Sequence, residues 1–338
     1  MSSTKSNQIY QELLNRIRKG IYPVGSRFPS EYLLADEFGV NKKTANKAVD
    51  LLVNDGLLAR RTGGAGTQVL RTAPFPAGYI AFIADAHPYQ MRILTGLQQC
   101  AQEFGYAVLV FFPSNPDCTQ LIDSLVHSAV RGLVFCSHFG RCAVNSPLPC
   151  VTVDHDIIHR YPECDLVNTD NLLGGKLMMA EIIRRGHRSP AVYSSGREFP
   201  DRQGRIAGFL ESMQLTGISS PQERIFYGVH YDDNAAVDAL KNILALISDC
   251  SIIACDADDA AISMLKAVRK MAPEITVTSF GNSLHGADRL AAVEQFPELQ
   301  GSAACRRLMH NIAAGIAGNG YRELIAPKLV NADEIPVI

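Results

Sequence analysis

The sequence predicts a small, mainly helical N-terminal unit followed by a larger α/β unit with parallel sheets. Its 338 residues exceed the length of one ordinary domain, and 47% of them are hydrophobic. Apolar residues first recur at helical spacing, and from residue 79 onward short apolar strands alternate with helical segments. Charge divides in the same way, because residues 1–71 contain 11 Lys and Arg against 6 Asp and Glu, whereas the remainder contains 21 against 28. We therefore expect a basic domain at 1–71, a linker at 72–78 and an acidic domain at 79–338.

The basic domain begins with a predicted helix at 7–20. Ile9, Leu13 and Ile17 repeat every four residues on one side of it. The residues at 22–29 are expected to be extended, because two prolines interrupt any helix there.

Two further helices joined by a tight turn form a predicted helix-turn-helix. Ser30 is suited to begin the first of these helices and Gly39 to end it, and Asn41 is suited to begin the next. One side of the last helix is apolar, with Ala45, Ala48, Val49 and Leu52. The opposite side is polar, with Lys42, Lys43, Asn46, Lys47 and Asp50. Solvated charged faces are common on helices, but the basic charge of this domain favours a face that enters a DNA groove.

A glycine-rich hairpin follows the helix-turn-helix. A strand at 57–61 leads into a turn at 62–66 and a returning strand at 67–70. Glycine allows close approach to a sugar-phosphate backbone and arginine supplies positive charge, so the hairpin is a predicted wing. The predicted DNA contacts are Arg27, Ser30, Glu31, Asn41, Lys42, Lys43, Thr44, Asn46, Lys47, Arg61, Gly63 and Gly64.

Residues spread over the basic domain match one known motif: Gly25, Pro29, Ser30, Glu31, Leu34, Ala35, Phe38, Gly39, Val40, Thr44, Ala48, Gly56 and Leu57. In this motif the domain resembles the winged-helix domain of the GntR family of bacterial regulators. The resemblance implies binding to double-stranded DNA, and it aligns the two base-contacting arginines of the family with Lys42 and Asn46. Since arginine suits guanine and asparagine suits adenine, we expect an operator unlike the usual one of the family.

The acidic domain consists of predicted strands that alternate with helices. A first series has strands at 79–84, 107–112, 132–136 and 150–153 and helices at 90–104 and 118–129. A second series has strands at 166–168, 190–193, 251–255 and 275–280 and helices at 174–185, 202–214 and 260–270. Repeated βα units imply parallel sheets covered by helices, so we expect two α/β lobes. Ligands of such sheets bind beyond the carboxyl ends of the strands, which places a cleft between the lobes.

Several segments of the acidic domain match a second known pattern: 87–89, 149–154, 168–171, 174–175, 185–188, 205–209 and 275–280. They resemble the effector domains of LacI/GalR-type regulators and the periplasmic sugar-binding proteins related to them. With a GntR-type head, the whole arrangement is similar to the arabinose-repressor kind of bacterial regulator. The resemblance implies a transcriptional repressor that binds a two-fold operator as a homodimer and responds to a small carbohydrate held between the lobes.

The candidates for effector binding lie where this resemblance places sugar contacts: His87, Tyr89, Gln90, Asp154, Arg205, Asp256 and Asn282. A sugar needs charged or amide groups for paired hydrogen bonds and an aromatic ring against its carbon-hydrogen face. Structural roles remain as alternatives. Asp154 could cap a turn, Arg205 could pair with Asp201, and Asp256 could be an exposed loop carboxylate.

Two further positions qualify the effector site. The resemblance implies two aspartates after the strand that ends at Phe280, but Gly281 and Asn282 stand there, so the class of ligand stays open. Asp170 is expected to cap the following helix instead of binding a ligand.

Motifs of catalytic and metal sites do not occur in the sequence. It has no phosphate-binding Gly-x-x-x-x-Gly-Lys-Ser and no dinucleotide-binding G-x-G-x-x-G pattern. His155, Asp156, His159 and Cys164 fit no closed metal site by their spacing. We expect no enzyme activity, no cofactor and no metal. The alternatives are an α/β enzyme that acts on a sugar, a regulator with an effector other than a sugar, and a module that binds another protein.

The cysteines and the N-terminus bear on the compartment. The nine cysteines are scattered without a C-x-x-C spacing, so we expect buried free thiols. Residues 1–7 lack an apolar signal core, and no apolar run reaches the roughly 18 residues of a membrane helix. The sequence therefore predicts a cytoplasmic protein without membrane contact.

Overall fold

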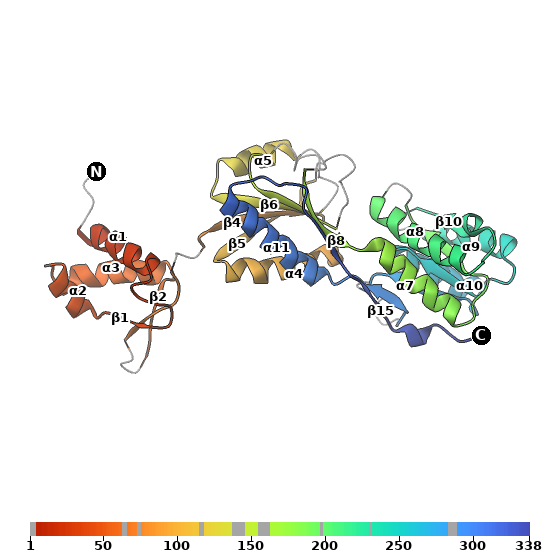
Figure 1. Ribbon diagram of the computed structural model, residues 1–338, viewed down its shortest axis with the longest axis horizontal. Helices are drawn as coiled ribbons and strands as arrows, with labels where there is room; N and C mark the ends of the chain where they lie inside the picture. The colour runs from red at the N-terminus through yellow and green to blue at the C-terminus, as the bar shows by residue number, and fades with distance from the viewer. Residues whose placement is uncertain are drawn as a thin grey trace. The chain divides into compact units, whose positions relative to one another are not determined.

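The computed structural model describes residues 5–62, 66–72, 76–114, 118–136, 146–154, 163–196, 199–229, 232–282 and 289–338. Figure 1 colours the chain from red at the N-terminus to blue at the C-terminus and labels many of its helices and strands. None of the helices in these ranges combines the length and the apolar character that a bilayer span needs.

The N-terminal domain is a winged helix-turn-helix. Its helices are α1 (Lys5–Arg18), α2 (Glu31–Glu37) and α3 (Lys42–Asn54). Its antiparallel sheet has the order β1-β3-β2, made of β1 (Arg27–Phe28), β2 (Leu58–Arg60) and β3 (Thr67–Val69). The predicted helix-turn-helix and wing are thus confirmed.

An apolar core joins these three helices to the wing. Leu13, Ile17, Leu34, Leu52 and Leu57 are fully buried. Each such side chain contributes about 1.5–3 kcal/mol through burial, which explains why the apolar side of α3 faces inward. The polar side of α3 consequently faces away from the core.

The first lobe contains a six-stranded sheet with the order β14-β8-β7-β6-β4-β5. Its strands are β4 (Gly78–Ala84), β5 (Tyr106–Phe111), β6 (Val130–Cys136), β7 (Cys150–Val153), β8 (Asp165–Thr169) and β14 (Arg322–Ile325). Its helices are α4 (Pro88–Glu103), α5 (Thr119–Val126) and α11 (Pro297–Ala314). The pairs β6/β7, β7/β8 and β8/β14 are parallel, so Asp154, directly after β7, lies at the carboxyl edge of the sheet.

The second lobe contains a six-stranded sheet with the order β10-β9-β11-β12-β13-β15. Its strands are β9 (Ala191–Ser194), β10 (Ile225–Tyr227), β11 (Ile252–Cys255), β12 (Thr276–Phe280), β13 (Ala292–Glu294) and β15 (Lys328–Val330). Its helices are α7 (Asn171–Arg184), α8 (Pro200–Leu215), α9 (Asp233–Leu246) and α10 (Asp258–Met271), with 3-10 turns η1 (Pro221–Arg224) and η2 (Ala332–Glu334). Only β15 runs antiparallel to its neighbour among the pairs of this sheet.

The chain passes between the two sheets at three places, after β8, after β13 and after β14. The strand at 166–168 is predicted to open the second lobe, and this assignment is wrong. It is β8 of the first sheet, paired in parallel with β7 through Val151 and Asp165. The change of lobe follows it at Asp170, whose side chain accepts a hydrogen bond from the Leu173 amide at 2.9 Å and caps α7, as expected.

Helices α7 and α8 meet backbone to backbone and lie side by side (Figure 1). A Cβ atom on Gly208 would lie 2.3 Å from the carbonyl oxygen of Leu172, and one on Gly175 would lie 2.2 Å from that of Arg205. No larger residue fits at either position unless the helices separate. Because α7 begins with Asn171 and α8 carries Arg205, this close contact sets how the two side chains meet.

Candidate functional site

The polar side of α3 presents Lys42, Lys43 and Lys47, all exposed. The Lys42 Nζ atom lies 3.8 Å from the centroid of the Tyr32 ring on α2, a cation-π contact. This contact holds Lys42 beside the first helix of the helix-turn-helix. Three ammonium groups on one exposed helix face are suited to phosphate, because neutralising phosphates releases bound counterions.

Two of the predicted DNA contacts, Ser30 and Asn41, also cap the starts of helices. Ser30 Oγ accepts a hydrogen bond from the Leu33 amide at 3.4 Å at the start of α2. Asn41 Oδ1 accepts from the Thr44 amide at 2.8 Å and from Thr44 Oγ1 at 2.9 Å at the start of α3. Their side chains therefore stabilise the starts of the two helices, of which α3 carries the lysines.

The wing places two predicted arginines differently. Arg27 is exposed on β1, and its Nε would lie 2.9 Å from a Cβ atom on Gly66, so it covers the end of the hairpin. Arg61 Nε donates to Gln68 Oε1 at 2.8 Å, within the hairpin itself. The predicted contacts Gly63 and Gly64 lie outside the described residues.

Arg60 is absent from the predicted contacts, yet it lies against the recognition helix. Its Nη2 donates to Asn46 Oδ1 at 2.7 Å and to Asp50 Oδ1 at 2.6 Å, and its Nη1 lies 3.4 Å from Glu31 Oε1. Because side chains alternate along a strand, the sequence indicates that Arg60 and Arg61 point to opposite faces of the hairpin. Which of the two faces α3 can be read only from the folded structure, where Arg60 contacts α3.

The larger domain contains a cavity of about 310 Å³ between its two lobes. The first lobe contributes Asp85, His87, Tyr89, Gln90 and Asp154. The second lobe contributes Phe199, Asp201, Arg202, Arg205, Ala257, Asp258, Asp259 and Phe280, and the segment between β13 and α11 adds Gln295. Of the predicted effector contacts, the structure thus brings together His87, Tyr89, Gln90, Asp154 and Arg205.

Arg205 lines the cavity and is bonded through all three of its nitrogens. Nε donates to Asn171 Oδ1 at 2.8 Å, Nη1 to the carbonyl oxygen of Asp256 at 2.9 Å, and Nη2 to Gln295 Oε1 at 3.1 Å. The guanidinium also lies 4.2 Å from the centroid of the Phe280 ring. All three acceptors are uncharged oxygens, so none of these hydrogen bonds pairs the guanidinium with a carboxylate.

Arg202, one helical turn before Arg205, forms the ionic part of the site. Its Nη1 lies 3.1 Å from Asp256 Oδ1 and its Nη2 3.2 Å from Asp259 Oδ1. Asp256 is fully buried, accepts from Ser194 Oγ at 2.5 Å and is not among the lining residues. It is therefore not the exposed loop carboxylate of the alternative interpretation.

Asp154 is held in an unusual backbone conformation at the edge of the cavity, with φ of 63°. Burial, and to a smaller extent the charge of Asp201, raise the pKa of its carboxyl group from the ordinary 3.8 to about 8, even though Arg205 and Tyr89 act to lower it. Gln90 is buried, and within the described residues its Oε1 atom has no hydrogen-bond partner. Asp154, with its raised pKa, and Gln90, with a buried amide oxygen, thus lie at the same cavity.

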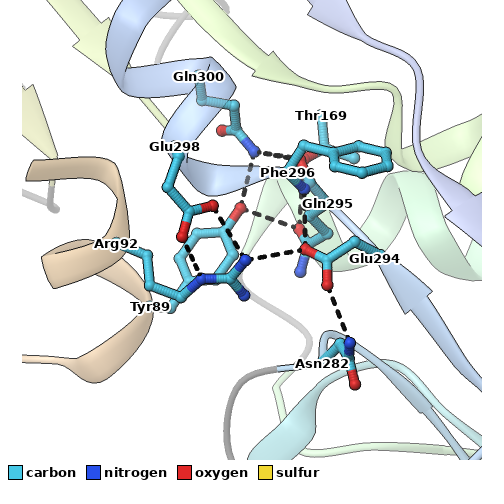
Figure 2. A network of polar contacts seen from close by, with 9 residues as sticks. All are labelled: Tyr89, Arg92, Thr169, Asn282, Glu294, Gln295, Phe296, Glu298 and Gln300. Atoms are coloured by element: carbon cyan, nitrogen blue, oxygen red, sulfur yellow. Dashed lines mark hydrogen bonds and ion pairs between the residues drawn. The ribbon is translucent and has the colours of Figure 1, made fainter. Parts of the chain in front are cut away.

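A glutamine links the cavity to two of the segments that join the lobes. Gln295 Oε1 accepts from Arg205, from Thr169 Oγ1 at 3.3 Å and from Tyr89 Oη at 3.4 Å. Gln300 Nε2 donates to Tyr89 Oη at 2.8 Å and to Thr169 Oγ1 at 3.0 Å, as Figure 2 shows. Residues that border the cavity are therefore bonded directly to the ends of β8 and β13.

A second set of contacts in Figure 2 joins the lobes beside this glutamine. Arg92 on α4 donates to Glu298 at 2.7 and 2.9 Å and reaches Glu294 at 3.5 Å. Asn282 Nδ2 donates to Glu294 Oε2 at 3.0 Å, and Asn282 is not among the lining residues. Phe296, between the two glutamates, has φ of 53° and donates its amide to Glu294 Oε1 at 3.1 Å. Asn282 is thus placed at the connection between lobes.

Nine lining residues were not among the predicted contacts, namely Asp85, Phe199, Asp201, Arg202, Ala257, Asp258, Asp259, Phe280 and Gln295. The sequence contains features from which some of these lining residues could have been predicted. Asp258 and Asp259 begin α10 just beyond a strand end, and Arg202 lies three residues before Arg205 on the same side of α8. Gln295 lies between a strand and a helix of different lobes, where no local pattern marks it.

Metal-binding groups do not gather in the described part of the chain. His155, Asp156 and His159 lie outside the described residues, and Cys164 is buried just before β8. Eight of the nine cysteines are described, and all eight are free and buried, as the sequence predicts.

Comparison with known families matches both parts of the chain. Residues 80–330 match the family described as periplasmic binding proteins and sugar binding domain of LacI family. The chain belongs to this family. Residues 5–69 match the bacterial regulatory proteins of the gntR family. The protein is therefore a LacI-type regulator of transcription that carries a GntR-type winged-helix head.

Individual relatives agree with this assignment. An arabinose metabolism transcriptional repressor of Halalkalibacterium halodurans is 23% identical over 308 residues, covering 83% of this chain and 81% of the relative. A protein of the same name from Geobacillus stearothermophilus is 23% identical, with coverage of 78% and 77%. The solved complex of the transcriptional regulator CelR with cellobiose has a TM-score of 0.66 at 17% identity, covering 90% of this chain and 98% of that one, and shows the same fold.

Proposed function

We propose that this regulator is a repressor whose hold on operator DNA changes when a small carbohydrate binds between its lobes. The observation that carries the proposal is a cavity lined from both lobes in a chain that also has a winged-helix head. A ligand that contacts both lobes favours one arrangement of them over others, and this difference in affinity is what shifts a regulatory equilibrium.

The chemistry of the cavity supports an uncharged, hydroxyl-rich effector. Hydroxyl groups both donate and accept, which suits the carboxyl and amide groups of Asp154 and Gln90, and the partly exposed ring of Phe199 supplies an aromatic surface for carbon-hydrogen groups. Arg202 is already paired with two carboxylates, so it does not call for an acidic sugar or a phosphate. We assign direct contacts to His87, Tyr89, Gln90, Asp154 and Arg205. Indirect roles fall to Asp256, which holds Arg202, and to Asn282, which holds Glu294.

On the DNA side, we propose that the lysines of α3 contact phosphate and that Asn46 contacts a base edge. A homodimer would place two such helices on a two-fold operator. The relatives named as arabinose metabolism repressors support the direction of control, and repression relieved by the effector is the proposed response.

Thermal unfolding of the full-length protein tests the effector. Pentoses, hexoses, their acids and their phosphates are added one at a time, because a ligand at 100 times its Kd adds about 2.7 kcal/mol to the free energy of unfolding. A ligand that raises Tm is then added to the protein bound to a duplex selected from random sequences. Loss of the DNA complex is the expected result.

Two results would contradict the proposal in different ways. Stabilisation only by phosphates or acids would replace the neutral sugar with an anionic effector. A sugar that raises Tm but leaves the DNA complex unchanged would show binding without regulation.

A further inference from the structure

One arginine of the wing joins the two helices of the helix-turn-helix through polar contacts. Arg60, the last residue of β2, bonds to Asn46 and Asp50 on α3 and approaches Glu31 on α2. The neighbouring Arg61 bonds to Gln68 inside the hairpin. Of these two adjacent arginines, one is therefore directed at the recognition helix and the other along the wing.

Asn46 has a defined orientation because its two neighbours differ in charge. Its Oδ1 accepts from Arg60 at 2.7 Å, and its Nδ2 donates to Asp50 Oδ2 at 3.3 Å. A flipped amide would place its NH₂ group against the guanidinium and its oxygen against the carboxylate. Both contacts would then be repulsive, so the pair Arg60 and Asp50 selects one of the two possible orientations.

We propose that Arg60 is a positioning residue that sets the base preference of the recognition helix by holding the Asn46 amide. The inference rests on the proposed contact of Asn46 with a base. Asn46 Oδ1 keeps a second lone pair and Nδ2 a second hydrogen atom after bonding to its neighbours. An amide held in one orientation offers an acceptor and a donor in fixed places, which is the pattern that pairs with the N6 and N7 edge of adenine.

Arg60 also changes the charge of the face that would meet DNA. Asp50 and Glu31 are carboxylates beside the lysines of α3, and unpaired carboxylates would repel phosphate. The guanidinium of Arg60 lies between them. Loss of Arg60 should therefore act in two separable ways, on overall affinity through charge and on base preference through the freed amide.

The test uses the full-length protein and a pool of duplexes with a randomised central segment. Wild type, Asn46→Ala, Arg60→Ala, Arg60→Lys and Arg61→Ala are each used to select preferred sequences. Asn46→Ala should lose discrimination at one base position of each half-site by about 5- to 150-fold, the range for a good paired contact. Arg60→Ala should lose about fivefold or more at that same position, although Asn46 is still present.

The other variants distinguish the positioning of the Asn46 amide from the effect of positive charge on overall affinity. Arg60→Lys keeps the charge but lacks the planar fork of donors, so overall affinity should return while the preference at that position stays relaxed. Arg61→Ala removes one charge from the same hairpin and should weaken all sequences alike, lowering the slope of log K against log salt by about 1. The double variant Asn46→Ala with Arg60→Ala should discriminate no worse than Asn46→Ala alone.

Other outcomes would overturn the inference. A uniform weakening by Arg60→Ala with an unchanged base preference would make Arg60 a phosphate contact or a brace. A change at a base position other than that of Asn46 would make Arg60 a base reader in its own right. No change of preference with Asn46→Ala would remove the proposed base contact as well. If Arg60→Ala does not fold, judged by thermal unfolding, Asp50→Ala removes the other hydrogen-bond partner of the amide and must relax the same position.

Discussion

Arg205 braces several elements of the fold and also borders the cavity proposed to hold the effector. It is buried, it donates to three acceptors, on α7, directly after β11 and directly after β13, and it borders the cavity. The alternative of a pair with Asp201 does not describe its contacts, because Asp201 accepts from Asn168 at 2.5 Å and from Asn171 at 3.2 Å. Truncation of Arg205 should therefore change two measurable quantities.

Arg205→Ala is expected to lower both stability and effector affinity. Acceptors left without a donor reduce the free energy of unfolding by about 1–3 kcal/mol, and loss of a charged hydrogen bond to the effector weakens Kd by roughly ten- to a hundredfold. Denaturant unfolding and calorimetric titration measure the two effects. Arg184→Ala, which removes an exposed arginine from α7, is the control and should change neither strongly. A normal Kd with reduced stability would leave Arg205 as a brace only.

Asp154 gives the protein a pH dependence of known sign. Burial holds the pKa of its carboxyl group at about 8 in the native protein, against an ordinary 3.8. Between these two values the native state binds one more proton than the unfolded chain, so this residue makes stability fall as pH rises. Asp154→Asn should flatten that fall in a series of Tm values across the window. Asp238→Asn, at an exposed carboxylate, should leave the wild-type slope intact, and an equal slope in Asp154→Asn would refute the assignment.

At the scale of elements, the connection after β13 carries contacts that exist only when the lobes are arranged as observed. Arg92 belongs to the first lobe and Glu294 to the second, and the two meet at 3.5 Å. Glu298, in contrast, lies in the same lobe as Arg92 and pairs with it at 2.7 Å. Arg92 therefore forms one ion pair between the lobes, with Glu294, and one within its own lobe, with Glu298, so the effects of removing each can be compared.

Glu294→Gln should weaken effector binding although Glu294 does not line the cavity. The substitution removes the ion pair with Arg92, which stabilises the arrangement in which both lobes border the ligand. A partly exposed ion pair contributes up to about 1 kcal/mol, which corresponds to about a fivefold change in Kd. Glu298→Gln is the matched control, because it breaks the pair within the lobe. Equal Kd values for the two variants would show that the contact between lobes has no part in binding.

The elements differ in how far sequence alone could predict them. The period of α3 and the caps at Ser30 and Asn41 are local, so the helix-turn-helix was predictable down to its polar face. The sheet of β8 was not, because buried parallel strands look alike whichever sheet they join.

The difference between local patterns and contacts in space also explains which site residues could be predicted from the sequence. Residues just after strands, such as Asp154, reach the cavity because strand ends share an edge. The contacts of Arg60 and Gln295 depend on which elements meet in space, and neither residue differs locally from an ordinary polar residue. Asp256 was placed correctly after β11, but its direction, inward to Arg202, follows from packing.

At the scale of the whole molecule, the separation into a head and an effector domain is a prediction in its own right. The winged helix has its own buried core, and the matched families divide the chain between residues 69 and 80. The Ala77 amide donates to the Gly105 carbonyl oxygen at 2.7 Å, so the backbone just before β4 is already bonded within the fold. The choice of a first residue for a truncated protein should respect this bond.

A fragment that begins at Pro76 should fold alone and bind the effector with the Kd of the full chain, because it keeps the Ala77 bond and every described residue that lines the cavity. DNA retention should vanish with the head. A fragment that begins at Tyr79 is the control, since it lacks Ala77 and part of β4, and it should unfold at a lower temperature. Thermal unfolding with and without the effector, followed by titration, compares the two. Aggregation of the longer fragment, or a Kd that differs from that of the full chain, would mean that the head contributes to the fold or the site of the effector domain.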